Sequence, residues 1–115
     1  MKSKSETKVT ANALTQMALK TLPLCGFVVW RQNNGGVYDP TKKVFRRNSS
    51  TPGISDILGY QKKTGKIIAI EIKVGRDKLS WQQTEFLKGI NDNGGFAHVV
   101  RTPEELENII EHYKI

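Results

Sequence analysis

The sequence predicts an α/β fold, a mixed β-sheet flanked by helices, with its elements in the order α-β-β-β-α-β-α. Three observations predict this class. Apolar residues recur at helical spacing near both ends of the chain, and short runs of strand-forming residues lie between them. Two of those runs are joined by a tight turn, as in a hairpin. A strand–helix–strand unit follows the hairpin, which implies a sheet with both antiparallel and parallel neighbours.

The first half of the chain contains one predicted helix and one clear strand. Residues 7–22 have apolar side chains at helical spacing, and Pro23 ends the pattern. Residues 26–31 form a short apolar run typical of a strand, and residues 32–36 are rich in asparagine and glycine, which indicates a turn. Residues 37–52 are polar and basic, so we expect an exposed loop or an edge strand there.

The predicted hairpin opens the second half. Residues 54–60 are expected to form its first strand, and a turn signal at residues 62–65 leads into the second. Residues 66–74 give the clearest strand pattern in the sequence, because apolar residues dominate both of their faces.

The remaining elements are a helix, a strand and a final helix. Ser80 is a suitable N-cap for a helix that runs to about residue 91. Residues 96–101 read as a strand, and Thr102 followed by Pro103 indicates the start of the last helix.

The size and charge of the chain limit the kinds of protein it encodes. Its 115 residues fit a single domain that spans residues 1–115. The net charge of +7 points to a polyanionic partner. Residues 1–63 contain 11 lysines and arginines against 3 acids, whereas residues 64–115 contain 7 against 8. We therefore expect a surface of the first half to face phosphates.

The sequence gives no sign of export or of a membrane. No apolar run approaches the roughly 18 residues needed to span a bilayer. The N-terminus lacks the apolar stretch of a signal peptide, and the single cysteine, Cys25, is consistent with a reducing compartment. We therefore expect a cytoplasmic protein.

Charged residues near the end of the strand at residues 66–74 indicate a catalytic site. With period-two alternation Glu71 and Lys73 project from one face, whereas the opposite face is apolar. The paired strand brings Asp56 alongside. Two carboxylates at adjacent strand ends suit Mg²⁺ or Mn²⁺, and a lysine beside them suits phosphodiester hydrolysis. A salt-bridged solvent face is the alternative for either fragment alone, but spacing, apolar opposite face and net charge together favour catalysis.

The same residues resemble a known nuclease signature. Asp56 followed by Glu71-Ile72-Lys73 looks like the Asp…(Asp/Glu)-x-Lys signature of the PD-(D/E)xK nuclease superfamily. Within that superfamily the chain is similar to the virus-type replication-repair nuclease (VRR-NUC) domain. The similar segments are residues 52–58 (PGISDIL), 70–73 (IEIK), 79–83 (LSWQQ) and 94–101 (GGFAHVVR). Ser55 stands where the family often has proline, and Ile72 where it often has valine, so neither change affects a charged position.

The resemblance implies a restriction-endonuclease-like fold and an endonuclease that hydrolyses DNA with Mg²⁺ or Mn²⁺. It implies that Asp56 and Glu71 bind the metal, with the backbone carbonyl of Ile72 as a further ligand. It also implies that Lys73 serves the nucleophilic water.

Two further candidates have structural alternatives. Gln83 matches the family's glutamine after the lysine strand, where it would orient Lys73, the water or a phosphate oxygen; its alternative is a capping box at the start of the helix. Glu6 matches an acid that the superfamily commonly supplies from its first helix as a metal or water ligand, although an acid also favours a helix N-terminus.

Basic and polar residues of the first half are candidate DNA contacts. Some resemble the Arg-x-Asn that follows the first strand in this family, and the others form a basic group suited to phosphates; a plain turn and a solvated loop are the alternatives. The candidates are Arg31, Asn33, Asn34, Lys42, Lys43, Arg46 and Arg47. Cys25, His98 and His112 lack catalytic or metal-ligand spacing, so we expect structural roles for them.

The resemblance also implies a structure-selective substrate. Small stand-alone domains of this kind resemble Holliday junction resolvases, which work as two-fold dimers on four-way DNA junctions. We therefore expect a homodimeric junction-resolving nuclease in the cytoplasm of a bacterium or a phage-infected host. The alternatives are a flap or nicking nuclease, a catalytically silent DNA-binding module of the same fold, and an interaction subunit that uses its acidic final helix.

Overall fold

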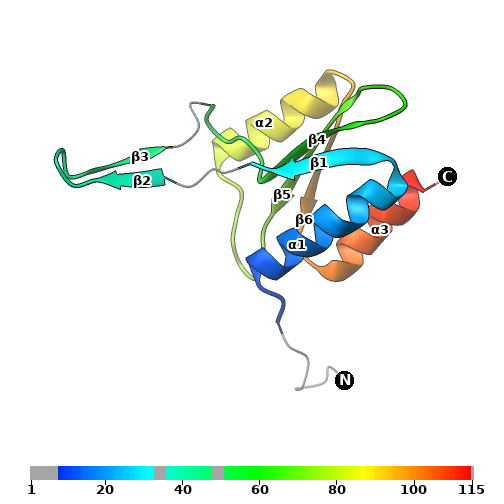
Figure 1. The fold of residues 1–115 in the computed structure, drawn as a ribbon, viewed down its shortest axis with the longest axis horizontal. Coiled ribbons are helices and arrows are strands. Elements are labelled where there is room, and N and C mark those ends of the chain that lie inside the picture. Colours follow the sequence, from blue (N-terminus) through cyan, green and yellow to red (C-terminus); the bar gives the residue numbers. More distant parts are fainter. Residues whose placement is uncertain (1–7, 33–35, 48–50, 115) are drawn as a thin grey trace.

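A mixed four-stranded β-sheet forms the centre of the computed structural model, which describes residues 8–32, 36–47 and 51–114. Its strands are β1 (Phe27–Arg31), β4 (Ile57–Gln61), β5 (Ile67–Ile72) and β6 (Phe96–Val100). The order across the sheet is β1-β4-β5-β6, with antiparallel β1/β4 and β4/β5 pairs and a parallel β5/β6 pair. The predicted mixed sheet is therefore present, with the predicted hairpin at its centre (Figure 1).

Helices cover both faces of this sheet. α1 (Ala11–Thr21) and α3 (Pro103–Tyr113) lie on one face and α2 (Trp81–Asp92) lies on the other (Figure 1). A large hydrophobic cluster lies under α1 and α3, and a smaller one lies under α2. The buried members of the large cluster are Leu14, Ala18, Leu22, Phe27, Ile57, Ile68, Ile70, Ile72, Val100 and Leu106, and those of the smaller one are Ala69, Leu87 and Ala97. None of the helices in the described part of the chain is long and apolar enough to cross a membrane.

α1 is shorter than the helix expected over residues 7–22. Thr10 is its N-cap, with the side-chain hydroxyl accepting a hydrogen bond from the Ala13 N–H at 3.0 Å. The α-helix ends at Thr21, and the chain continues through Pro23 as a short 3₁₀ helix, η1 (Leu22–Cys25). The change from α to 3₁₀ geometry follows from the proline, which has no N–H to continue the α-helical ladder.

The caps predicted for α2 and α3 are both present. The Ser80 hydroxyl accepts a hydrogen bond from the Gln83 N–H at 3.1 Å, so α2 begins at Trp81 as expected. The Thr102 hydroxyl accepts one from the Glu105 N–H at 3.1 Å, with Pro103 at the first helical position.

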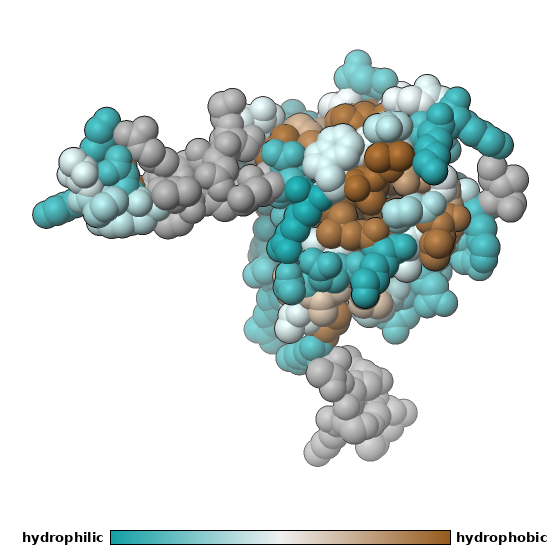
Figure 2. Space-filling model, viewed as in Figure 1, coloured by the Kyte–Doolittle hydropathy of each residue, from teal (hydrophilic) through white to brown (hydrophobic). Residues whose placement is uncertain are grey.

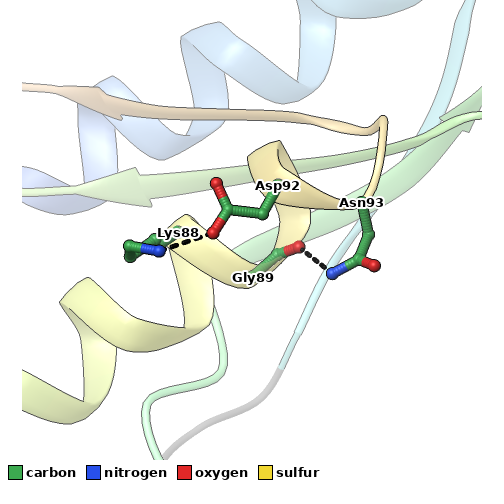
Figure 3. Close-up of polar contacts among 4 residues, drawn as sticks. All are labelled: Lys88, Gly89, Asp92 and Asn93. Carbon is green, nitrogen blue, oxygen red and sulfur yellow. Dashed lines mark hydrogen bonds and ion pairs between the residues drawn. The ribbon is translucent and has the colours of Figure 1, made fainter.

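The C-terminal end of α2 is fastened to the turn that follows it. Asn91 bonds both the N–H and the carbonyl of one residue of β6, at 2.9 and 3.3 Å. Figure 3 shows the Asn93 amide donating to the Gly89 carbonyl at 2.8 Å and Lys88 paired with Asp92 at 2.6 Å. These contacts hold the C-terminal end of α2 against β6, and they thereby help to set the position of its first turn on the sheet.

Residues 36–47 differ from the prediction of a loop or an edge strand. They form a separate antiparallel hairpin of β2 (Gly36–Asp39) and β3 (Val44–Arg47), which stands away from the main sheet (Figure 1). The Asp39 carboxylate accepts hydrogen bonds from the N–H groups of Thr41 and Lys42, and Lys43 has a φ of +55° in the turn. The described part of the chain therefore has two strands, β2 and β3, beyond the expected order α-β-β-β-α-β-α.

Candidate active site

Asp56 and Glu71 lie side by side at one end of the β4–β5 hairpin. The register pairs Ile57 with Ile70, so one step further along the two strands Asp56 lies opposite Glu71. Both carboxylates face α2, because Ile57 and Ile70 pack into the cluster on the other side of the sheet. Gln32 extends the row beyond β1, since its N–H donates to the Asp56 carbonyl at 2.7 Å.

The Glu71 carboxyl is almost completely buried. Its exposed fraction is 2%, and its Oε2 accepts a hydrogen bond from the Gln83 side-chain amide at 3.1 Å. The other oxygen, Oε1, is buried without a hydrogen-bond partner among the described residues. A buried acceptor in this condition is rare in folded proteins and calls for a partner beyond the described residues.

Burial and the neighbouring carboxylate both oppose the ionisation of Glu71. Burial has the larger effect and the charge of Asp56 adds to it, and together they raise the pKa of Glu71 from 4.5 to about 8. The positive charge of Lys73 acts in the opposite direction and lowers that pKa. Glu71 is therefore largely protonated at neutral pH unless a further positive charge reaches it.

Gln83 forms the capping box that the sequence offered as one alternative, and the same amide also contacts the candidate site. Its Oε1 accepts a hydrogen bond from the Ser80 N–H at 2.9 Å, which completes the capping box of α2. Because that contact fixes the orientation of the amide, its Nε2 is directed to donate to Glu71. In the site Gln83 thus contacts Glu71, whereas the sequence suggested Lys73, a water or a phosphate oxygen.

Asp56 is fixed by the backbone of the neighbouring strand. Its Oδ2 accepts a hydrogen bond from the Ile72 N–H at 2.8 Å. The contact joins the residue before β4 to the last residue of β5, so the position of one carboxylate depends on the strand that carries the other.

Gly53 packs the loop before Asp56 against the first turn of α2. A Cβ atom at this position would lie 2.3 Å from the carbonyl carbon and oxygen of Gln82 and 2.6 Å from the nitrogen of Gln83. Its φ of +73° also favours glycine. The loop that carries Asp56 and the helix that carries Gln83 approach this closely because residue 53 has no side chain.

Lys73 lies on the same side of the sheet as Glu71, as the alternation predicted. Its N–H donates to the Val100 carbonyl at 3.0 Å, so the strand geometry continues one residue past the end of β5. Val74 then packs against the cluster under α1 and α3, which leaves Lys73 on the α2 side.

This pair of carboxyls fits a divalent cation. No group of three or more His, Cys, Asp or Glu side chains suited to a metal occurs within the described residues, so the fit rests on Asp56 and Glu71. Mg²⁺ is usually bound through one or two carboxylates, with waters and substrate phosphates as its other ligands. The unpartnered oxygen of Glu71 and its raised pKa are what a cation between the two carboxyls would correct.

Several predicted site residues lie apart from this centre or outside the description. Arg31 is exposed, and its guanidinium donates to the Asn12 side chain of α1 at 2.9 Å. Lys42 and Lys43 are exposed at the turn of the β2–β3 hairpin. Glu6, Asn33 and Asn34 lie outside the described residues, and so do the side chains of Arg46 and Arg47.

The residues expected to be structural lie elsewhere. A nitrogen of the His98 ring and the Tyr113 hydroxyl are 2.7 Å apart, and burial lowers the pKa of His98. The Cys25 thiol donates to the Leu22 carbonyl at 3.4 Å, and burial raises its pKa. Neither His98 nor Cys25 contacts the carboxylate pair.

Gln32 is the member of this row that the sequence did not indicate. It falls in the asparagine- and glycine-rich stretch that predicts a turn, yet its backbone continues β1 to the level of Asp56. The alternation of side chains along β1 could have indicated it, because Gln32 lies two residues after Trp30 and therefore on the same face of the sheet, nearer to the carboxylates.

Fold and site together define a nuclease-like α/β domain, with two carboxyls, a lysine and a glutamine gathered at the end of a hairpin. The VRR-NUC domain model matches residues 25–103, which is more than half of the chain, and the chain therefore belongs to this family. The match includes Asp56, Glu71, Lys73 and Gln83, and membership implies a nuclease-type function. The resemblance noted in the sequence is thus confirmed. No curated protein and no solved structure was found to match the chain.

Proposed function

We propose that this protein is a divalent-cation-dependent DNA endonuclease that hydrolyses phosphodiester bonds, with four-way junctions as its substrate. The observation that carries the proposal is the buried Oε1 of Glu71, which lacks a partner among the described residues and lies beside a second carboxylate. A DNA-binding module without catalysis has no use for two carboxyls that repel phosphate and each other.

Asp56 and Glu71 would hold Mg²⁺ or Mn²⁺, with the carbonyl of Ile72 as a further ligand. A bound ion would polarise a phosphate oxygen and lower the pKa of a nearby water. The contacts of the two carboxyls support this role, because Asp56 is held by the Ile72 N–H and Glu71 by the Gln83 amide, so both are positioned before an ion arrives.

Lys73 would act on the reacting groups directly. Its ammonium group lies on the face of the sheet that carries both carboxylates, and its charge is close enough to lower the pKa of Glu71. From this position it would orient the attacking water and stabilise the negative charge that develops on the phosphate oxygens.

The branched substrate is proposed on the family resemblance and on charge. The first 63 residues carry most of the net charge of +7, and the exposed Lys42 and Lys43 extend this charge onto the hairpin. Pairs of incisions in a four-way junction require two sites related by a two-fold axis, so a homodimer is part of the proposal.

Labelled DNA substrates with and without metal test these statements. Purified protein is incubated with four-way junction, flap, nicked, single-stranded and linear duplex DNA in Mg²⁺, Mn²⁺ or EDTA. We expect metal-dependent cleavage with a preference for the junction, and loss of cleavage in Asp56→Asn and Lys73→Ala. Lys88→Ala and Glu85→Gln are matched controls on the exposed side of α2 and should retain activity.

Each other outcome changes a different part of the proposal. Absence of metal-dependent cleavage of every substrate would refute the nuclease, and junction binding without cleavage would favour the silent module. Preference for a flap or a nicked duplex would replace the junction as substrate while leaving the chemistry in place. Sedimentation tests the dimer, since a monomer at all working concentrations contradicts paired incision.

A further inference from the structure

Half of the sheet's α2 face carries exposed aromatic and aliphatic side chains. α2 packs on β5 and β6, whereas Trp30 of β1 and Tyr60 of β4 are 47% and 43% exposed. Figure 2 shows hydrophobic side chains gathered along the β1 edge of the sheet. We call this surface the aromatic strip; its residues are Val28, Trp30, Leu58 and Tyr60.

The strip leads directly to the carboxylates. Trp30 is paired with Leu58 and Val28 with Tyr60, so the two rings are diagonal neighbours on adjacent strands. All four side chains face α2, because Leu58 packs into the cluster under that helix. The row of Gln32 and Asp56 comes next along the same strands, about 7 Å from Trp30 and about 14 Å from Tyr60.

Charges at the two ends of the strip suit a polyanion that lies along it. The exposed Lys62 and Lys63 lie in the β4–β5 turn, two and three residues after Tyr60. The proposed cation site lies at the opposite end.

We propose that Trp30 and Tyr60 stack unpaired bases of the DNA strand that enters the active site. Exposed aromatic rings on a sheet face bind single strands in this way without regard to sequence, because every base has a π-face. The inference rests on the proposed function and requires that bases beside the scissile phosphate are unpaired in the bound DNA, as they are in a flap or at a junction whose branch point opens on binding. Trp30 and Tyr60 are thus positioning residues that select open DNA over continuous duplex.

Binding without cleavage tests the stacking first. Trp81, 73% exposed at the start of α2, is replaced in Trp81→Phe so that Trp30 gives the fluorescence. Titration with a short oligothymidylate in EDTA should quench the tryptophan fluorescence of Trp81→Phe. The Trp30→Phe variant retains Trp81, and its fluorescence should change little when the oligonucleotide binds. Trp30→Ala and Tyr60→Ala should each weaken binding by about fivefold to 150-fold. Phenylalanine at either position should preserve most of the affinity, since it retains a ring.

Ile67→Ala is the matched control, because Ile67 lies directly opposite Tyr60 and is 41% exposed but has no ring. Oligonucleotide affinity should be unchanged in Ile67→Ala. Equal losses in Ile67→Ala and Tyr60→Ala, together with a shift toward monomer in sedimentation, would overturn the proposal in favour of an interface between copies. Unchanged affinity in both alanine variants of the rings would overturn it as well.

Cleavage separates this inference from the function it rests on. Trp30→Ala should reduce cutting of DNA with unpaired nucleotides at the branch and leave the slower cutting of fully paired duplex unchanged. If the wild type cleaves but shows no quenching and no such preference, the stacking is refuted and the nuclease stands. Quenching in a protein that never cleaves leaves the stacking intact and refutes the nuclease.

Discussion

Replacing Glu71 by glutamine is expected to stabilise the metal-free protein at alkaline pH and to remove much of its pH dependence. A carboxyl with a raised pKa binds more protons in the folded state than in the unfolded state. The pKa of Glu71 is 4.5 in the unfolded state and about 8 in the folded state, so the free energy of unfolding falls as the pH rises from 4.5 to about 8. The stability that the protonated Glu71 contributes is fully present only below pH 4.5. Glutamine keeps the size of the side chain and resembles the protonated carboxyl, so it does not lose this stability.

The size of the effect follows from the pKa. A shift from 4.5 to about 8 corresponds, at 1.36 kcal/mol per pH unit, to about 5 kcal/mol between the two ends of the window. This is comparable with the whole stability of many small domains, so it is readily measurable. The glutamine amide also gives Asp56 a donor in place of a second negative charge, which supports the same direction.

Urea unfolding in EDTA at several pH values between 5 and 8.5 provides the measurement. The difference in unfolding free energy between Glu71→Gln and wild type should be small at pH 5 and grow toward about 5 kcal/mol at pH 8.5. The lowered pKa of His98 affects both proteins equally and cancels in the difference. Glu85→Gln, an exposed acid of α2, should follow the wild type. A difference between Glu71→Gln and wild type that stays constant with pH would refute the reasoning.

Three further predictions follow from the same contacts. At pH 7 about 0.9 of a proton should leave Glu71 when Mg²⁺ binds, measured by calorimetry in buffers of different ionisation enthalpy; no release would contradict the raised pKa. Gly53→Ala should lower the unfolding free energy by about 2–4 kcal/mol and weaken Mg²⁺ binding. Gly65 also has a positive φ, +74°, but a Cβ there would meet nothing within 4 Å, so Gly65→Ala should lower the unfolding free energy only through backbone strain. Gln83→Ala should cost about 1–3 kcal/mol and raise the pKa of Glu71 further, whereas Ser80→Ala should cost about 1 kcal/mol without that rise in pKa.

The sequence predicted the parts of the fold that depend on local patterns. Alternation along residues 66–74 was enough to place Glu71 and Lys73 on one face, because the opposite face is apolar as far as Val74. The caps at Ser80 and Thr102 were also readable, since each hydroxyl bonds an N–H only three residues away.

The parts that failed or stayed open depend on contacts between distant segments. The β2–β3 hairpin lies in a segment that is polar and basic overall, and its strands are only four residues long, so period two gave no clear signal there. The burial of Glu71 results from α2 and the loop at Gly53 closing over β5, which no spacing in the chain reveals. Gln83 appeared to have two competing roles because a sequence does not show that one amide group can serve both.

The same contacts explain why the site can be both destabilising and well ordered. Glu71 and Asp56 would separate if they were free to move, but the Gln83 amide holds one and the Ile72 N–H holds the other. Because the two carboxyls cannot move apart, the charge of Asp56 raises the pKa of Glu71. A divalent cation placed between the two carboxyls would remove the repulsion and contact the buried Oε1 of Glu71; a proton that Glu71 shares with Asp56 in a hydrogen bond removes the same repulsion. Because Glu71 is largely protonated at neutral pH, the ion must displace that proton, whereas above pH 8 it meets two carboxylates that the sheet, the loop at Gly53 and α2 already hold together.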